Sequence, residues 1–119
     1  MLFIINYNYM EIIENTKEVM ATIEIKCDYC GQKIKKGNVY NTTILKDENG
    51  KYVWENHISC DKIADKLNMF DHVIDEGLTS VEFIDNIEEE FSDLLGCDDE
   101  FSFLDKLKIV KEYYKLKHN

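Results

Sequence analysis

The chain lacks both arginine and proline: its 119 residues include 14 basic side chains, and every one of them is lysine. Without arginine there is no planar guanidinium fork, the group that most often reads guanine and grips phosphate at two points. The lysines are outnumbered by 24 acidic residues, which gives a net charge of −10. This charge disfavours nonspecific contact with nucleic acid or anionic membrane, so we expect neither as a direct partner.

Long apolar runs are also missing, since no segment approaches the ~20 residues of a transmembrane helix. The first nine residues, MLFIINYNY, are apolar but have no basic start and no small-residue cleavage site, so they are not typical of an export signal. We therefore expect a cytoplasmic protein with one modest core. In a reducing compartment, paired cysteines more often bind metal than form disulfides.

Three of the four cysteines form two close pairs together with a histidine. The pattern is Cys27-x2-Cys30-x26-His57-x2-Cys60. A two-residue spacer lets both side chains of a pair reach one ion, and Gly31 allows the chain to turn after the first pair. These donors predict one tetrahedral Zn²⁺ ion. Because four protein ligands leave no open position, the zinc should be structural.

The cysteines also allow other interpretations. A Cys-x2-Cys pair also occurs in redox proteins, where it follows a strand in a parallel α/β pattern that this sequence does not show. Cys97 lies outside both pairs, and packing or capping is its default interpretation.

The residues around the first cysteine pair favour β-structure. Residues 22–26 alternate apolar and polar side chains, which indicates a strand. Residues 39–54 contain two β-branched and aromatic runs on either side of Asn49-Gly50, a strong hairpin turn signal. Residues 10–20 are compatible with a helix and residues 2–7 with a strand. We expect residues 1–22 to be an N-terminal extension that precedes the zinc module.

Three helices are expected from the spacing of apolar residues. The first covers about residues 59–70. The second begins at Thr79, where Thr79-x-x-Glu82 forms a capping box, and ends at Gly96. The third covers about residues 99–117. These elements together predict an α+β fold.

The order of a cysteine turn, a hairpin and a ligand pair at a helix start resembles a treble-clef zinc finger over residues 23–70. The ligand spacing resembles LIM and PARP-type fingers, and the long gap and Trp54 are nearer the PARP type. A LIM module would supply a second set of ligands, and a PARP-type finger binds broken DNA with basic residues that include arginine; this chain has neither feature. The resemblance implies a zinc module followed by two helices, over residues 71–119, packed on it as a single domain.

Negative charge is concentrated in the second half of the chain. From Asp71 to Asp105 there are 13 acidic residues and no lysine, whereas residues 106–119 hold five lysines and one acid. An acidic helix face is usually only solvated, but a dense one also attracts basic surfaces. The candidate partner-binding residues lie on one side of the second helix and before the third: Glu82, Asp85, Glu89, Asp93, Asp98, Asp99 and Glu100.

The sequence contains no catalytic set, so we expect a binding protein and not an enzyme. The leading hypothesis is protein–protein interaction with a basic surface, such as that of a nucleic-acid-binding enzyme. The layout also looks like that of small phage- or prophage-encoded zinc proteins, and its acidity resembles that of phage inhibitors such as anti-CRISPR proteins, which act in the host cytoplasm. The alternative is a nucleic-acid-binding zinc-finger regulator that uses Lys33, Lys35 and Lys36. A third hypothesis is a purely structural interaction module.

Overall fold

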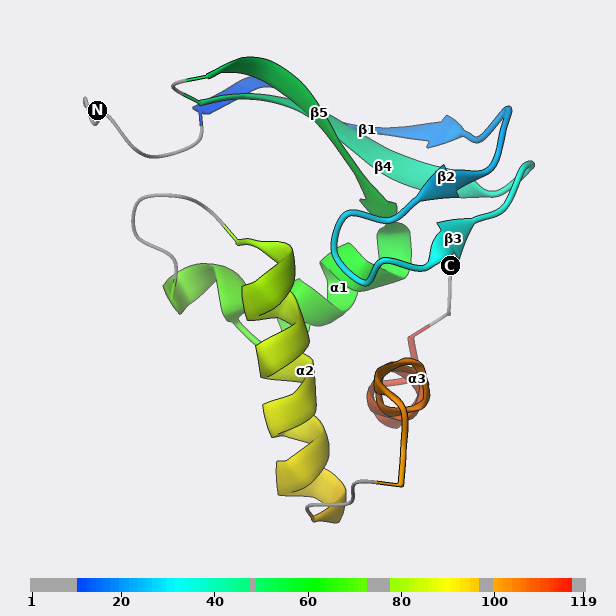
Figure 1. Ribbon diagram of the computed structural model, residues 1–119, viewed down its shortest axis with the longest axis vertical. Coiled ribbons are helices and arrows are strands. Elements are labelled where there is room, and N and C mark those ends of the chain that lie inside the picture. The colour runs from blue at the N-terminus through cyan, green and yellow to red at the C-terminus, as the bar shows by residue number, and fades with distance from the viewer. Residues whose placement is uncertain (1–10, 48, 73–77, 97–99, 117–119) are drawn as a thin grey trace.

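The computed structural model describes residues 11–47, 49–72, 78–96 and 100–116. Its upper layer in Figure 1 is a three-stranded antiparallel sheet with the strand order β1-β4-β5. The bounds of these strands are Glu11–Met20 for β1, Val39–Asp47 for β4 and Gly50–His57 for β5. The hairpin predicted over residues 39–54 is confirmed, and β5 continues as far as His57.

β1 corrects the expectation for residues 10–20, because this segment is a strand and not a helix over residues 11–20. It pairs antiparallel with β4 along its length, with two irregularities in register. The hydroxyl groups of Thr16 and Thr43 share a hydrogen bond of 2.7 Å between the two strands. The helix propensity of Glu, Lys and Met is a weak preference, and pairing with β4 overrides it. Residues 2–7 lie outside the part of the chain that the structure describes.

A second, two-stranded sheet carries the first cysteine pair. It consists of β2, Ile25–Lys26, and β3, Lys33–Ile34, so the strand predicted over residues 22–26 is confirmed only at its end. The backbone of the turn between them closes with a 2.9 Å hydrogen bond from the amide of Gly31 to the carbonyl of Cys27. Gly31 has a φ of +77°, which a residue with a side chain rarely adopts. This segment, residues 27–31, is called the cysteine turn below.

The first helix is shorter than predicted. α1 spans Ile58–Lys66 and directly follows β5, so His57 stands at the junction of a strand and a helix. Asn68 then adopts a positive φ of 56°, which ends the α-helix, and the chain continues in the 3-10 helix η1, Met69–His72.

The second and third helices form an adjacent pair below the sheet (Figure 1). α2 spans Ser80–Leu95, and its predicted capping box is confirmed by reciprocal hydrogen bonds between Thr79 and Glu82. α3 spans Phe103–Tyr113, which is shorter than predicted at both ends. The hydroxyl of Ser102 caps its first turn, and Lys115, with a positive φ of 61°, follows its last.

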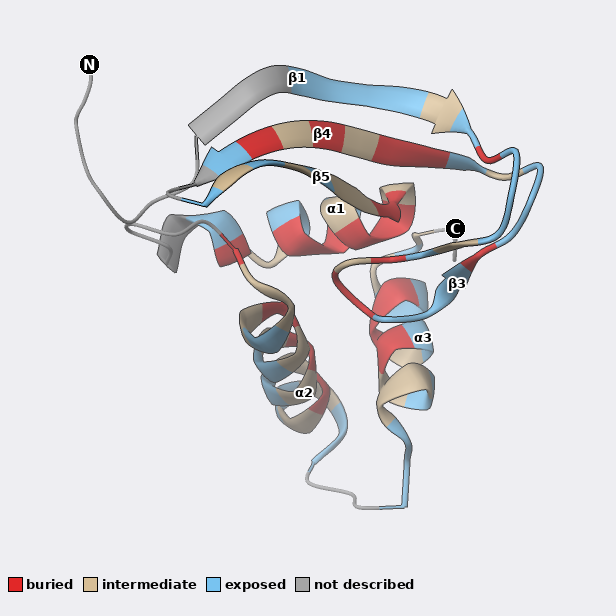
Figure 2. Cartoon of the chain, turned by 45° about the horizontal axis from the view of Figure 1, so that its top comes forward, coloured by how far each residue is buried: buried red, intermediate tan, exposed pale blue. Residues whose placement is uncertain are grey.

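One cluster of buried side chains joins the sheets to the helices. The ring of Tyr29, in the cysteine turn, stacks on Phe83 of α2 and meets Trp54 of β5 edge-on, with ring centroids 5.0 Å apart in both pairs. The inner sides of α1, α2 and α3 are buried along their length (Figure 2). The fold is therefore α+β, as predicted, and its core brings α2 and α3 against the cysteine turn.

Candidate metal centre

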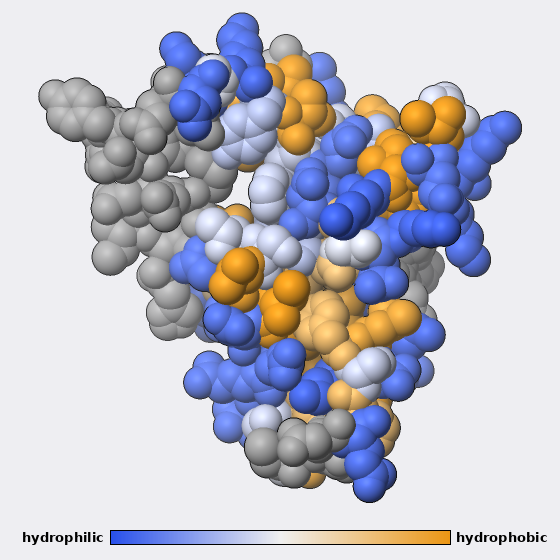
Figure 3. Space-filling view, viewed as in Figure 1, coloured by the Kyte–Doolittle hydropathy of each residue, from blue (hydrophilic) through white to orange (hydrophobic). Residues whose placement is uncertain are grey.

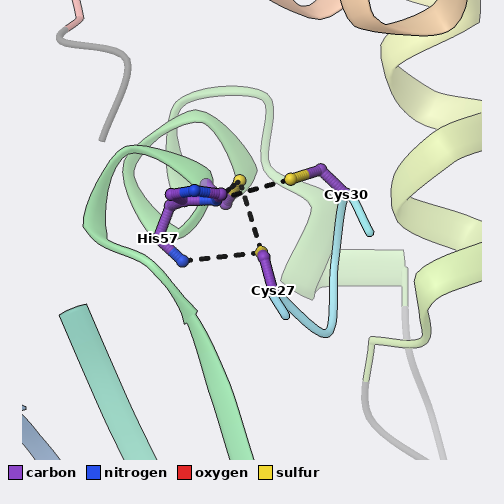
Figure 4. A group of neighbouring side chains, drawn as sticks. Cys27, Cys30 and His57 are labelled. Atoms are coloured by element: carbon purple, nitrogen blue, oxygen red, sulfur yellow. Dashed lines mark hydrogen bonds between the residues drawn. The ribbon is translucent and has the colours of Figure 1, made fainter. Parts of the chain in front are cut away.

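The four predicted ligands come together from three elements. Cys27 and Cys30 lie in the cysteine turn, His57 ends β5, and Cys60 lies in the first turn of α1. All four side chains are buried, and their donor atoms lie within 4.8 Å of one another. Figure 4 shows Cys27, Cys30 and His57 pointing toward a common centre. The four residues therefore form a candidate site for a single metal ion.

The distances between the donor atoms are short and similar. The Sγ atoms of Cys27 and Cys60 are 3.9 Å apart. The Nδ1 atom of His57 lies 3.4 Å from Sγ of Cys30 and 3.7 Å from Sγ of Cys60. Nδ1 is therefore the histidine atom that faces the three sulfur atoms.

The backbone fixes which nitrogen of His57 is available. Its Nε2 atom lies 3.1 Å from the carbonyl oxygen of Lys33 in β3. A carbonyl can only accept a hydrogen bond, so Nε2 carries a proton, and Nδ1 is the nitrogen that can bind a metal once its own proton is lost. The amide of His57 also donates to Sγ of Cys27 at 3.5 Å.

Among the cysteines of the cluster, Cys27 is the thiol that ionises first, whereas hydrogen bonds with Cys27 and Cys30, together with burial, raise the pKa of Cys60 well above its ordinary value. Hydrogen bonds with Cys30 and Cys60 hold the pKa of Cys27 far below its ordinary value. Burial acts to lower the pKa of His57, but hydrogen bonds to Cys27 and Cys30 outweigh it and raise that pKa to about 9. A buried thiolate with further sulfur donors beside it attracts a cation, and a metal ion at the centre would supply one.

Sequence reasoning missed Lys111, which reaches the centre from α3. This lysine is only 3% exposed. Its ammonium group donates to Oγ of Ser59 at 2.7 Å and to Sγ of Cys60 at 3.5 Å. A buried ammonium group needs hydrogen-bond acceptors, and its positive charge acts to lower the pKa of Cys60. The signal in the sequence was a lysine directly beside Val110 on the apolar side of the third helix.

The acidic candidate residues divide into different groups. The carboxylate of Glu82 is occupied by the cap of α2, where it accepts from the amide and hydroxyl of Thr79 at 3.2 Å and 3.1 Å. Three others are exposed on the outer side of α2, and we call them the acidic face: Asp85, Glu89 and Asp93. Glu100 is exposed in the turn before α3.

Three residues of the sequence analysis, Cys97, Asp98 and Asp99, lie outside the described ranges. Of the lysines proposed for nucleic-acid contact, Lys33 forms a 3.5 Å ion pair with Glu24. Lys35 and Lys36 are exposed.

The fold and the site define this chain as a small α+β protein with one candidate Cys3His metal centre. Comparisons with protein-family models, with curated proteins and with solved structures found no match. No helix within the described ranges has the length and apolar character needed to span a membrane. What the protein does must therefore be argued from its own residues.

Proposed function

We propose that the four-residue centre holds one structural Zn²⁺ ion and that residues 23–70 form a treble-clef zinc module around it. At a zinc–sulfur bond length of about 2.3 Å, two thiolates at corners of a tetrahedron lie about 3.8 Å apart. The 3.9 Å between Sγ of Cys27 and Sγ of Cys60 agrees with this value. Three thiolates with one imidazole are a donor set typical of structural zinc.

Four protein donors close the coordination sphere, so the proposed zinc has no position for substrate or water. Its role is to hold the cysteine turn, the end of β5 and the start of α1 in one arrangement. The protein then acts by binding, and its distinctive surface is the proposed site of that activity.

We propose that this surface is the acidic face of α2 and that its partner is a protein with a basic surface. The single observation that supports this is how the carboxylates of the helix are used. On its flanks, Glu88 is paired with Lys106 at 3.1 Å, and Glu90 accepts from the hydroxyl of Tyr114. The three carboxylates of the acidic face make no ion pair within the described part of the chain.

Apolar side chains flank these carboxylates. Val81 is 67% exposed at the start of α2, and Leu95 is 58% exposed at its end. In Figure 3, hydrophobic patches interrupt the hydrophilic surface over the helical half. Apolar contact provides binding energy, whereas the carboxylates provide steering and selectivity, so the combination suits a protein partner better than a simple counter-ion.

A nucleic-acid-binding enzyme with a lysine- and arginine-lined channel is the partner class that best complements such a face. In this proposal the chain acts as an inhibitor that occupies the channel, and a phage origin would fit that role. Charge complementarity is the observation that supports this partner class. The alternative, a nucleic-acid-binding zinc finger using Lys33, Lys35 and Lys36, predicts salt-dependent binding of DNA or RNA, which a gel shift measures directly.

The test neutralises the acidic face without touching the cap. The variant Asp85→Asn, Glu89→Gln, Asp93→Asn keeps Glu82. The matched control, Glu18→Gln, Glu24→Gln, Asp65→Asn, removes the same charge from exposed positions elsewhere. Affinity capture from host extract at low and moderate salt should recover the same specific partner with the wild type and the control, and lose it with the acidic-face variant.

The dissociation constant of the purified partner is then measured for the wild type, the control and the acidic-face variant, and only the acidic-face variant should bind more weakly. A variant that retains the partner with the same salt response would show that the acidic face is only a solvated surface.

A further inference from the structure

A hollow of about 640 Å³ lies beside the metal centre, between the cysteine turn with β3 on one side and α3 on the other. In Figure 2, β3 and α3 lie next to each other at this place. The lining comes from residues 30–38, from His57 and from residues 104–111. Its volume falls within the range of about 300–1,000 Å³ that small-molecule sites occupy.

The charge of this hollow is opposite to that of the whole protein. Its lining contains four lysines and no carboxylate: Lys33, Lys35, Lys108 and Lys111. Lys111 is occupied at the metal centre. The ion pair of Lys33 with Glu24 is largely exposed and therefore weak. Lys35 and Lys108 are exposed, and neither makes an ion pair with a described carboxylate.

The two lysines without an acidic partner come from opposite walls. Lys35 follows β3, and Lys108 lies in the middle of α3. The wall of Lys35 also contributes Gln32, and the wall of Lys108 also contributes Leu104 and Leu107. The hollow thus offers positive charge on both walls, polar side chains and two leucines, a combination that suits a ligand with an anionic group and an apolar part.

We propose that this hollow binds a small molecule that carries a phosphate group, of about the size of a nucleoside monophosphate. A phosphate has several oxygens and up to two negative charges, so ammonium groups on opposite walls can hold it together. A flat apolar portion, such as a base, would lie against Leu104 and Leu107. This site is separate from the acidic face and does not depend on the partner proposed for it.

The overall charge argues for a small ligand and against a polymer. A nucleic-acid strand long enough to leave the hollow would meet the field of a protein with a net charge of −10. A ligand that fits inside is closest to the lysines, and salt screens the more distant carboxylates, since the Debye length is about 8 Å at physiological ionic strength.

The test is a two-dimensional NMR titration of the zinc-loaded full chain with adenosine monophosphate, inorganic phosphate and adenosine. Adenosine monophosphate should give saturable shifts at backbone amides of residues 31–38 and 104–111. Inorganic phosphate should shift the same amides more weakly, and adenosine should shift none of them. Absence of saturable shifts with adenosine monophosphate, or equal shifts with adenosine, would overturn the proposal.

Charge variants separate this site from general electrostatics. Lys35→Gln with Lys108→Gln should weaken binding of adenosine monophosphate roughly tenfold or more, because two direct contacts to an oxyanion are lost. The control, Lys46→Gln with Lys51→Gln, removes two exposed charges from the β4–β5 hairpin and should change affinity less than about twofold. Both variants should keep the wild-type spectrum without ligand, since all four lysines are exposed.

Two further results would count against the proposal. Equal affinity in the two variants would place the ligand elsewhere. A twelve-nucleotide single strand that binds more tightly than adenosine monophosphate, and is released by moderate salt, would show that the lysines serve a nucleic-acid surface.

Discussion

At the metal centre the polar groups are buried and bonded to one another, whereas on the outer side of α2 the carboxylates stand in solvent. The imidazole of His57 reaches a backbone carbonyl, and Lys111 reaches both a hydroxyl and a sulfur. Asp85, Glu89 and Asp93 have no comparable contacts among the described residues. The difference is the basis of our proposal that the first region provides stability and the second provides recognition.

The largest effect should come from removing the metal. Structural zinc contributes roughly 10–16 kcal/mol in small zinc modules, which is comparable to the whole stability of a typical domain, about 5–15 kcal/mol. We expect one zinc per chain by elemental analysis and loss of the folded circular dichroism spectrum when a strong chelator is added. Cys60→Ser should behave like the chelated protein, because it removes one ligand from the buried centre.

Cys97→Ser is the matched control, since this cysteine lies outside both ligand pairs in the sequence. It should keep one zinc per chain. A chelated protein that is metal-free and melts at the same temperature as the untreated one would remove the basis of the comparison.

A smaller effect should come from Lys111→Met, which keeps the length of the side chain and removes its charge. Partners that bond to metal ligands typically contribute 10–100-fold to metal affinity. We expect zinc affinity, measured by competition with a colorimetric chelator, to fall by about tenfold or more. The cause is the loss of the hydrogen bond to Sγ of Cys60 and of the positive charge beside three thiolates.

Lys108→Met, on the same helix but exposed, is the control and should leave zinc affinity unchanged. If both variants bind zinc like the wild type, then Lys111 serves only the packing of α3 against α1.

Sequence reasoning found those parts that depend on local chemistry. The ligand spacing predicted which four side chains come together, the Asn-Gly turn predicted the hairpin, and the capping box predicted the start of α2. β1 was missed because its sequence has no strand period, and its conformation is set by pairing with β4. Lys111 was missed because its partners lie more than 50 residues away, as does the wall that α3 contributes to the hollow.

The smallest effect should separate Glu82 from the other carboxylates of α2. Glu82 and Thr79 satisfy each other's backbone amides, so Thr79→Ala should lower the free energy of unfolding by about 1 kcal/mol. Asp85, Glu89 and Asp93 satisfy no such group, and neutralising all three should change that free energy by less than about 0.5 kcal/mol. Urea unfolding of the zinc-loaded proteins measures both values. A triple variant destabilised as much as Thr79→Ala would mean that the acidic face also serves the fold, and the division between stability and recognition would then fail at α2.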